Sequence, residues 1–93
     1  MADIKLKGSE LSLVNTASNT VSLGSLVRMI NTDSAAKFLI TQKNSDTTTL
    51  GTITLNAAGT GGDEVFLIKD PTDTLESNTS STGKVLAVSI GYF

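Results

Sequence analysis

The sequence predicts an all-β protein: a single antiparallel β-sandwich or jelly-roll-like barrel of seven to eight strands over residues 1–93. Short apolar or alternating runs recur at strand-length spacing along the whole chain. The residues between these runs are rich in Asn, Asp, Ser, Thr and Gly, which favour turns. No helix of about 12 residues is available for a parallel crossover, so we expect antiparallel sheets.

The first third of the chain contains four predicted strands, separated by Gly8-Ser9 and by polar residues 15–19. Most of them alternate apolar and polar residues, as a half-buried strand does. The fourth is almost continuously apolar, which is typical of a strand covered on both sides. The four predicted strands are Asp3–Lys7, Leu11–Val14, Thr20–Leu23 and Leu26–Asn31.

The rest of the chain contains four more predicted strands and the clearest turns. A turn at residues 44–46 joins two of the strands into a hairpin, and Gly51 marks a bulge or kink in the second of them. Asp70-Pro71-Thr72-Asp73 predicts a turn because proline presets the backbone at its second position. These predicted strands are Ala36–Lys43, Thr48–Leu55, Glu64–Lys69 and Lys84–Tyr92, with a polar loop over 77–83.

The composition argues against catalysis. The chain has no His, no Cys and no Trp, so the usual general base, the thiol nucleophile and the commonest transition-metal ligands are missing. The net charge of −2 is spread without a basic stripe, so we expect no nucleic-acid partner. No apolar run approaches the ~18 residues of a membrane span, and no secretory signal opens the chain, so we expect no membrane partner and synthesis in the cytoplasm.

Two motifs have a possible chemical interpretation. Gly59–Gly62 is a glycine cluster; a phosphate-binding loop would need a helix to start just after it, and the strand pattern that follows favours a hairpin or inter-strand loop instead. Asp63, Glu64, Asp70 and Asp73 form the densest acidic group, which could ligate calcium. We expect instead that Asp70 and Asp73 cap backbone amides of the Pro71 turn, and that the chain has no metal and no cofactor.

Three residues are candidate partner contacts: Arg28, Tyr92 and Phe93. Arg28 lies within the most apolar predicted strand and has three interpretations: a partner-facing charge, a buried pair with an acid, or an outward residue on a half-exposed strand. Alternation favours the last. Tyr92 and Phe93 fall on opposite faces of the final strand, so one ring meets a neighbour. The run Val65–Ile68 is apolar on both faces, which predicts an oligomer or a subunit of a larger assembly.

The order of several short motifs resembles small virion structural proteins of marine tailed phages, especially cyanophages. In that group an LVR-hydrophobic-N strand precedes a GE-V-F-hydrophobic-K strand and a PTDT turn. The resemblance covers about two-thirds of the chain, and one departure is Gly61-Gly62-Asp63, where a Pro-Gly turn is usual. The segments that carry it are Leu26–Thr32, Ile53–Leu55, Asp63–Lys69 and Asp70–Leu75.

The resemblance implies a non-enzymatic component of a virion. A capsid decoration or cement protein is the first expectation, and a collar, tail or fibre-associated component is the second. The partners would be other virion proteins, such as the major capsid protein or tail and collar proteins, together with further copies of the chain. A carbohydrate-binding β-sandwich is a third possibility, although such modules use aromatic platforms and aromatic residues make up 4% of this chain.

Overall fold

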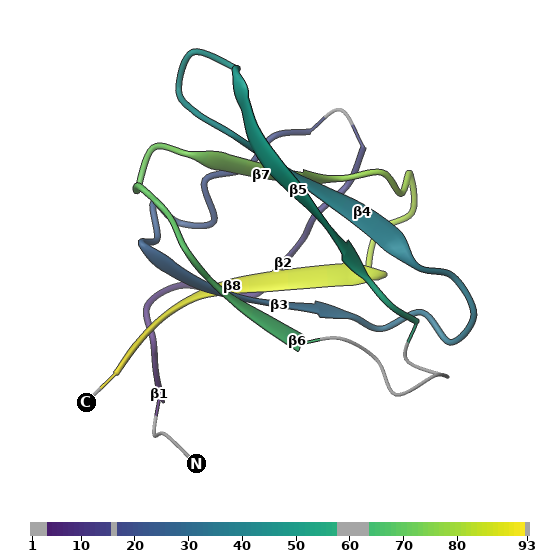
Figure 1. Ribbon diagram of the computed structural model, residues 1–93. Coiled ribbons are helices and arrows are strands. Elements are labelled where there is room, and N and C mark those ends of the chain that lie inside the picture. The colour runs from purple at the N-terminus through teal and green to yellow at the C-terminus, as the bar shows by residue number, and fades with distance from the viewer. Residues whose placement is uncertain (1–3, 16, 58–63, 93) are drawn as a thin grey trace.

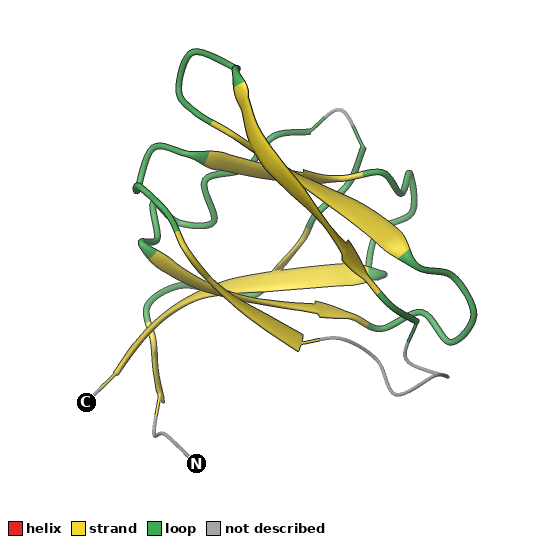
Figure 2. Ribbon diagram, in the orientation of Figure 1, coloured by secondary structure: helices red, strands yellow, loops and turns green. Residues whose placement is uncertain are grey.

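Two antiparallel sheets form a small β-sandwich, in agreement with the predicted fold class. The computed structural model describes residues 4–15, 17–57 and 64–92, and within this part of the chain every regular element is a strand (Figure 2). The eight strands are β1 (Ile4–Leu6), β2 (Leu11–Ser12), β3 (Leu26–Asn31), β4 (Phe38–Lys43), β5 (Thr49–Leu55), β6 (Glu64–Ile68), β7 (Thr74–Ser77) and β8 (Val85–Tyr92).

The sheets lie as two layers (Figure 1). The five-stranded sheet has the order β1-β8-β3-β6, and β2 also pairs with β8. The three-stranded sheet has the order β5-β4-β7. β8 is the centre of the larger sheet because β1 and β2 follow one another along one of its edges while β3 occupies the other. The strands in this centre are far apart in sequence, so the sheet is held by long-range pairing.

Side chains that alternate inward along each strand form the core between the layers. In β3, Val27 and Met29 are fully buried, and Met29 pairs with Ala87 of β8. Ile40 of β4 and Leu75 of β7 meet them from the other sheet. The buried cluster consists of Leu13, Val21, Val27, Met29, Ile40, Leu55, Leu75, Val85 and Ala87, with Leu11, Phe38, Val65 and Leu67 packed against it.

The two lateral sides of the sandwich differ. On one side, the segment between β2 and β3 closes the gap: Asn19 and Leu75 exchange two backbone hydrogen bonds, and the Ser77 hydroxyl donates to the carbonyl of Leu13 at 2.6 Å. On the other side, β5 pairs only with β4 and β6 only with β3 in the described part of the chain. This second side is therefore bounded by two edge strands.

The predicted strand Thr20–Leu23 is wrong. Val21, Ser22 and Leu23 have φ values of 54°, 57° and 55°, so this segment is a left-handed turn. The turn is held locally, because Val21 N–H donates to the Asn19 side chain at 2.7 Å and Gly24 N–H donates to the Val21 carbonyl at 3.1 Å. It buries the Val21 side chain completely. Tertiary burial and side-chain capping thus outweigh the strand preference of valine.

The sequence predicts no strand at β7: its pattern predicts a turn up to Asp73 and a polar loop from Ser77. The segment is short and mostly polar, and only Leu75 carries an apolar side chain. Leu75 and Ser77 nevertheless point inward and are buried. Pairing with β4 and burial of one leucine are enough to hold this strand.

The remaining predicted strands agree with the structure to within one or two residues at most ends. β4 and β5 form the predicted hairpin, and the side chain of Asn44 caps its turn by accepting from the amides of Asp46 and Thr48. The predicted bulge at Gly51 is confirmed, because the register shifts beside it and leaves Leu50 as the extra residue.

Candidate protein-binding face

The surface of the five-stranded sheet that points away from the core is unusually apolar. Register places Phe66 beside Arg28, Ile68 beside Leu26, and Val88 on the other side of Arg28. Leu6 pairs with Ile90 and therefore lies on the same surface. We call this surface the outer face; its residues are Leu6, Glu10, Leu26, Arg28, Ile30, Glu64, Phe66, Ile68, Leu86, Val88 and Ile90.

The apolar side chains of the outer face fall into a buried group and an exposed group. Val88 and Ile90 form a floor and are only 5% and 2% exposed. Ile68, Leu6 and Phe66 stand above it and are 81%, 67% and 45% exposed. A sheet with one solvated face normally alternates apolar and polar residues, so the outer face resembles a covered surface more than a solvated one.

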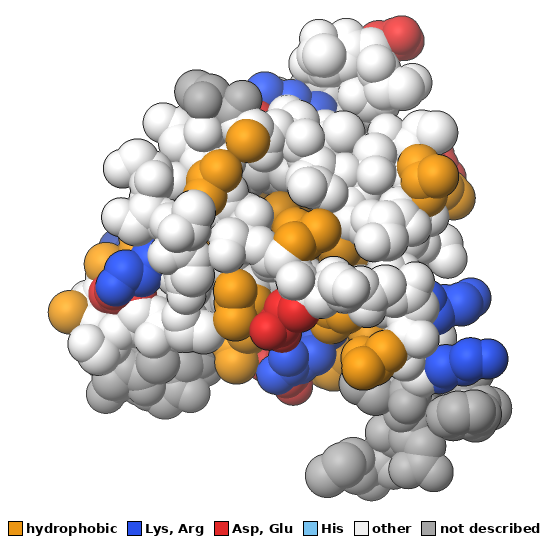
Figure 3. Space-filling view, turned by 180° about the vertical axis from the view of Figure 1, so that it is seen from behind, with side chains coloured by type: hydrophobic (Ala, Val, Ile, Leu, Met, Phe, Trp, Pro, Cys, Tyr) orange, Lys and Arg blue, Asp and Glu red, His pale blue; other side chains and the backbone are white. Residues whose placement is uncertain are grey.

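Arg28 lies at the centre of the outer face and pairs with two acids. Its Nε donates to the carboxylate of Glu64, and its Nη1 lies 3.9 Å from Oε2 of Glu10. The Arg28 side chain is 26% exposed, so the guanidinium is partly shielded. From behind, the molecule shows adjoining acidic and basic side chains with hydrophobic side chains on either side (Figure 3).

A hollow of about 510 Å³ opens on the outer face beside Arg28. Val88 and Leu6 give it apolar walls, and Glu10 and Arg28 give it charged ones. Residues 7–10 form its rim. They lie between the pairs Leu6–Ile90 and Leu11–Ala87, where β8 has only Val88 and Ser89, so the β1–β2 side of the pairing has two extra residues. The extra residues bring the Glu10 carboxylate over the sheet toward Arg28.

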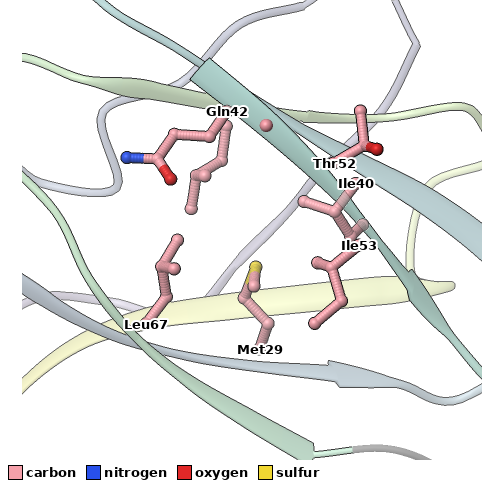
Figure 4. Close-up of a pocket in the computed structure, with 8 residues that line it drawn as sticks. Met29, Ile40, Gln42, Thr52, Ile53 and Leu67 are labelled. Carbon is pink, nitrogen blue, oxygen red and sulfur yellow. The ribbon is translucent and has the colours of Figure 1, made fainter. Parts of the chain in front are cut away.

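A second opening lies between the two edge strands. A slot of about 160 Å³ separates Leu67 and Met29 of the larger sheet from Ile40, Ile53 and Thr52 of the smaller one (Figure 4). Its lining is mostly apolar, with Gln42 as a polar group. The sheets therefore diverge toward the β5–β6 side.

The Pro71 turn forms as predicted, and hydrogen bonds within the turn and to Gln42 of β4 hold it. Asp73 N–H donates to the Asp70 carbonyl at 3.0 Å, and the Asp73 carboxylate accepts from Asp70 N–H at 3.3 Å and from the Gln42 amide at 3.0 Å. The predicted capping role is confirmed for Asp73 and is wrong for Asp70, which contributes backbone groups while its side chain is exposed. Burial lowers the pKa of Lys69, whose Nζ donates to two turn carbonyls.

Of the three predicted contact residues, the structure places one. Arg28 points outward on a half-exposed strand, as alternation favours, and it also pairs with acids. The side chain of Tyr92 and the whole of Phe93 lie outside the described residues. Sequence reasoning missed Leu6 and Glu10 as part of the face. Only the pairing of β1 and β2 with β8 brings them there.

Comparison with known proteins gives no relative: no family model, no curated protein and no solved structure matches the chain. Within the described residues, no group of three or more His, Cys, Asp or Glu side chains is placed to hold a metal ion. The same part of the chain contains no helix long and apolar enough to cross a membrane.

Proposed function

We propose that this chain is a non-enzymatic structural protein of a tailed-phage particle, a capsid decoration or cement protein that attaches to its neighbours through the outer face. The observation that carries the proposal is the cluster of exposed Leu6, Phe66 and Ile68 around ion-paired Arg28. Large apolar patches on small proteins mark interaction sites. The resemblance of the β3, β6 and Pro71-turn segments to small virion proteins supplies the particle context.

The dimensions of the outer face suit the centre of a protein interface. Strands lie ~4.8 Å apart and rise ~3.3 Å per residue, so four neighbouring strands of about five residues each span a flat area of roughly 300 Å². Protruding side chains enlarge this area, and a standard interface buries about 800 Å² per partner. The outer face thus provides an apolar core to which a polar rim is added on docking. Aromatic and Arg side chains are typical anchors of such cores.

The first test asks whether the chain is a particle component. Particles of the phage whose genome encodes the chain are purified by density and are immunoblotted with an antibody raised against the purified chain. We expect the chain in the particle fraction, and immunogold labelling over the head for a decoration protein. Gold confined to the neck or tail would instead indicate a collar, tail or fibre-associated role. Absence of the chain from the particles would overturn the proposal, and reproducible binding on a glycan array would favour a carbohydrate-binding module.

The second test asks whether the outer face makes the attachment. Ile68→Ser removes an exposed apolar side chain from this face, while Leu50→Ser removes one that is 54% exposed on the other sheet. Particles that lack the chain are mixed with each purified variant and sedimented. We expect Ile68→Ser to lower the bound fraction at least tenfold and Leu50→Ser to leave it unchanged. Equal losses for both variants would place the attachment elsewhere.

Copies of the chain also contact one another in this proposal, and the edge strands β5 and β6 offer backbone groups for such pairing. Analytical ultracentrifugation of the purified chain measures this self-association directly. A stable monomer at micromolar concentration that also fails to bind particles would overturn both the contact between copies and the attachment to the particle.

A further inference from the structure

We infer that the hollow beside Arg28 receives a lysine or arginine side chain of the partner protein, with its charged head on Glu10. This inference rests on the proposed function, because it concerns what the outer face binds. Its first support is shape. The hollow is open to solvent and bounded by Leu6 and Val88, which suit the aliphatic stem of a long basic side chain.

The second support is the charge balance of the outer face. Among the described residues that define it, this face carries one cation, Arg28, and two carboxylates, Glu10 and Glu64. Covering this face with an uncharged apolar surface would remove all three groups from water and leave one negative charge in excess. Burial of an unpaired carboxylate is strongly unfavourable, so a partner that supplies one cation is favoured.

The third support is that the two carboxylates are engaged unequally. Glu64 accepts a direct hydrogen bond from Arg28. The closest approach between Glu10 and Arg28 is 3.9 Å, well beyond the ~2.7–2.9 Å of a charge-assisted hydrogen bond. The two carboxylates are almost equally exposed, at 46% for Glu10 and 43% for Glu64, but of the two it is Glu10 that borders the hollow. It is therefore the carboxylate that an incoming cation meets.

The same charge balance disfavours a second copy of this chain as the occupant of the outer face. A symmetric contact between two outer faces would bring together two arginines and four glutamates, and would double the excess of negative charge. A different chain that presents a basic residue within an apolar surface matches both properties of the face. We therefore commit to a heterologous partner here.

The backbone of the hollow's rim is packed and hydrogen-bonded against the rest of the fold. Gly8 lies in the extra segment that forms its rim, and a Cβ atom at this position would lie 2.6 Å from the hydroxyl oxygen of Ser22. The rim is thus packed closely against the left-handed turn. Lys7 N–H also donates to the Ser89 carbonyl at 2.8 Å, which ties the rim to β8. A preformed site loses less entropy on binding.

The test uses tripeptide probes and amide chemical shifts of the full chain. The probes are acetyl-Leu-Lys-Leu-amide, its norleucine analogue and its glutamate analogue. We expect the lysine peptide to shift the amides of Leu6, Glu10 and Val88. We also expect it to bind roughly three to five times more tightly than the norleucine peptide, as a partly exposed ion pair of up to about 1 kcal/mol allows. The glutamate peptide should bind most weakly.

Glu10→Gln should abolish the preference for the lysine peptide over the norleucine peptide. The amide spectrum of the free variant should remain that of a folded protein. Asp46→Asn is the matched control, because it removes one negative charge at the exposed β4–β5 turn. Equal binding of the lysine and norleucine peptides, shifts that map outside the hollow, or an equal effect of Asp46→Asn would overturn the inference. Dimerisation that Leu6→Ser abolishes would overturn it too, because Leu6 lies on the outer face and outside the edge strands β5 and β6, so a second copy would then cover the face.

This result is separable from that of the proposed function. If the chain is present in particles and Ile68→Ser releases it, but the peptides show no preference for lysine, only the inference about the basic side chain fails. If the chain is absent from particles while Glu10→Gln abolishes a clear lysine preference, the particle assignment fails and the hollow remains a site for a basic side chain.

Discussion

The side-chain amide of Asn31 donates to the main-chain carbonyl of Leu55 at 3.1 Å and so ties β3 to the end of β5 in the opposite sheet. The same amide nitrogen lies 2.9 Å from the Ala36 carbonyl and 3.1 Å from that of Asn56. Asn31 is 1% exposed, and its side-chain oxygen accepts from Asp33 N–H. This one side chain joins the two layers where the chain crosses between them.

Asn31→Asp should destabilise the protein severely. The substitution replaces the donating amide with a carboxylate among carbonyl oxygens, which leaves buried acceptors without a donor. We expect a loss of about 3 kcal/mol or more in the free energy of unfolding, measured with denaturant at neutral pH. Asn78→Asp is the control, because the Asn78 side chain uses its oxygen to accept from Leu39 N–H and aspartate keeps that acceptor. Similar losses for both variants would contradict the proposed inter-sheet tie.

The sequence was a good guide to the direction of side chains and a poor guide to which strands meet. Alternation placed Arg28 outward, and the structure confirms it. The encounter of Glu10 with Arg28, by contrast, depends on an irregularity in the pairing of β1 and β2 with β8. A period of two along one strand carries no information about register against another strand. The binding face was therefore recognisable only in part.

The left-handed turn at residues 21–23 shows a second limit. Val21 and Leu23 read as alternate residues of a strand because β-branched and apolar residues favour that conformation. The positive φ values arise from burial of Val21 and from capping by Asn19, and both depend on neighbours that folding brings together. In β6, Val65 and Leu67 pack against the core. Both faces of that strand are apolar, so alternation offered this face and the face of Phe66 and Ile68 equally. The sequence alone left the choice open.

Phe66→Ala should have a modest effect on stability, because Phe66 is 45% exposed on the outer face. We expect a loss of about 1–2 kcal/mol, below the 3–5 kcal/mol of a fully buried phenylalanine. Met29→Ala, on the inward face of the neighbouring strand, should cost about 2–5 kcal/mol because Met29 is fully buried. Denaturant unfolding of both variants checks the order, and a larger loss for Phe66→Ala would place its ring in the core.

Acid should remove a stabilising interaction at Asp33. The Lys84 ammonium, 2.7 Å away, together with the amides of Ala36 and Ala35, lowers the pKa of Asp33 from 3.8 to about 2. The unfolded chain then binds more protons than the folded one between these values, so stability falls as the pH falls. The contribution is present above about pH 4 and is lost as the pH drops through about 2.

Denaturant unfolding of the natural chain and of Asp33→Asn between pH 6 and pH 2 tests this. The stability difference between them should be constant above pH 4 and should shrink toward pH 2. Lys84→Met removes the largest cause of the low pKa, so it should shift the acid loss to higher pH. A stability difference that stays the same down to pH 2 would show that the Asp33 carboxylate is not specifically stabilised in the folded state.

Gly24→Ala should destabilise the protein through a direct clash with β8. A Cβ atom at residue 24 would lie 2.5 Å from the hydroxyl oxygen of Ser89 and 2.9 Å from its Cβ. Ser89 is 2% exposed and sits in the middle of β8, so it has little room to move. We expect a loss of about 1–3 kcal/mol, the range typical of an overpacked interior, measured by thermal or denaturant unfolding.

A double-mutant cycle separates the clash with Ser89 from the tight contact with the Val21 carbonyl. Ser89→Gly removes both atoms that the new methyl group would strike, and by itself should cost about 0.5–1 kcal/mol because glycine weakens a strand interior. If the clash is the cause, Gly24→Ala should be much less harmful in the Ser89→Gly background, with a coupling energy of about 1 kcal/mol or more. The Val21 carbonyl, 3.1 Å from the same Cβ position, is unchanged in the double variant, so rescue should be incomplete. Strict additivity would show that the contact with Ser89 does not cause the loss.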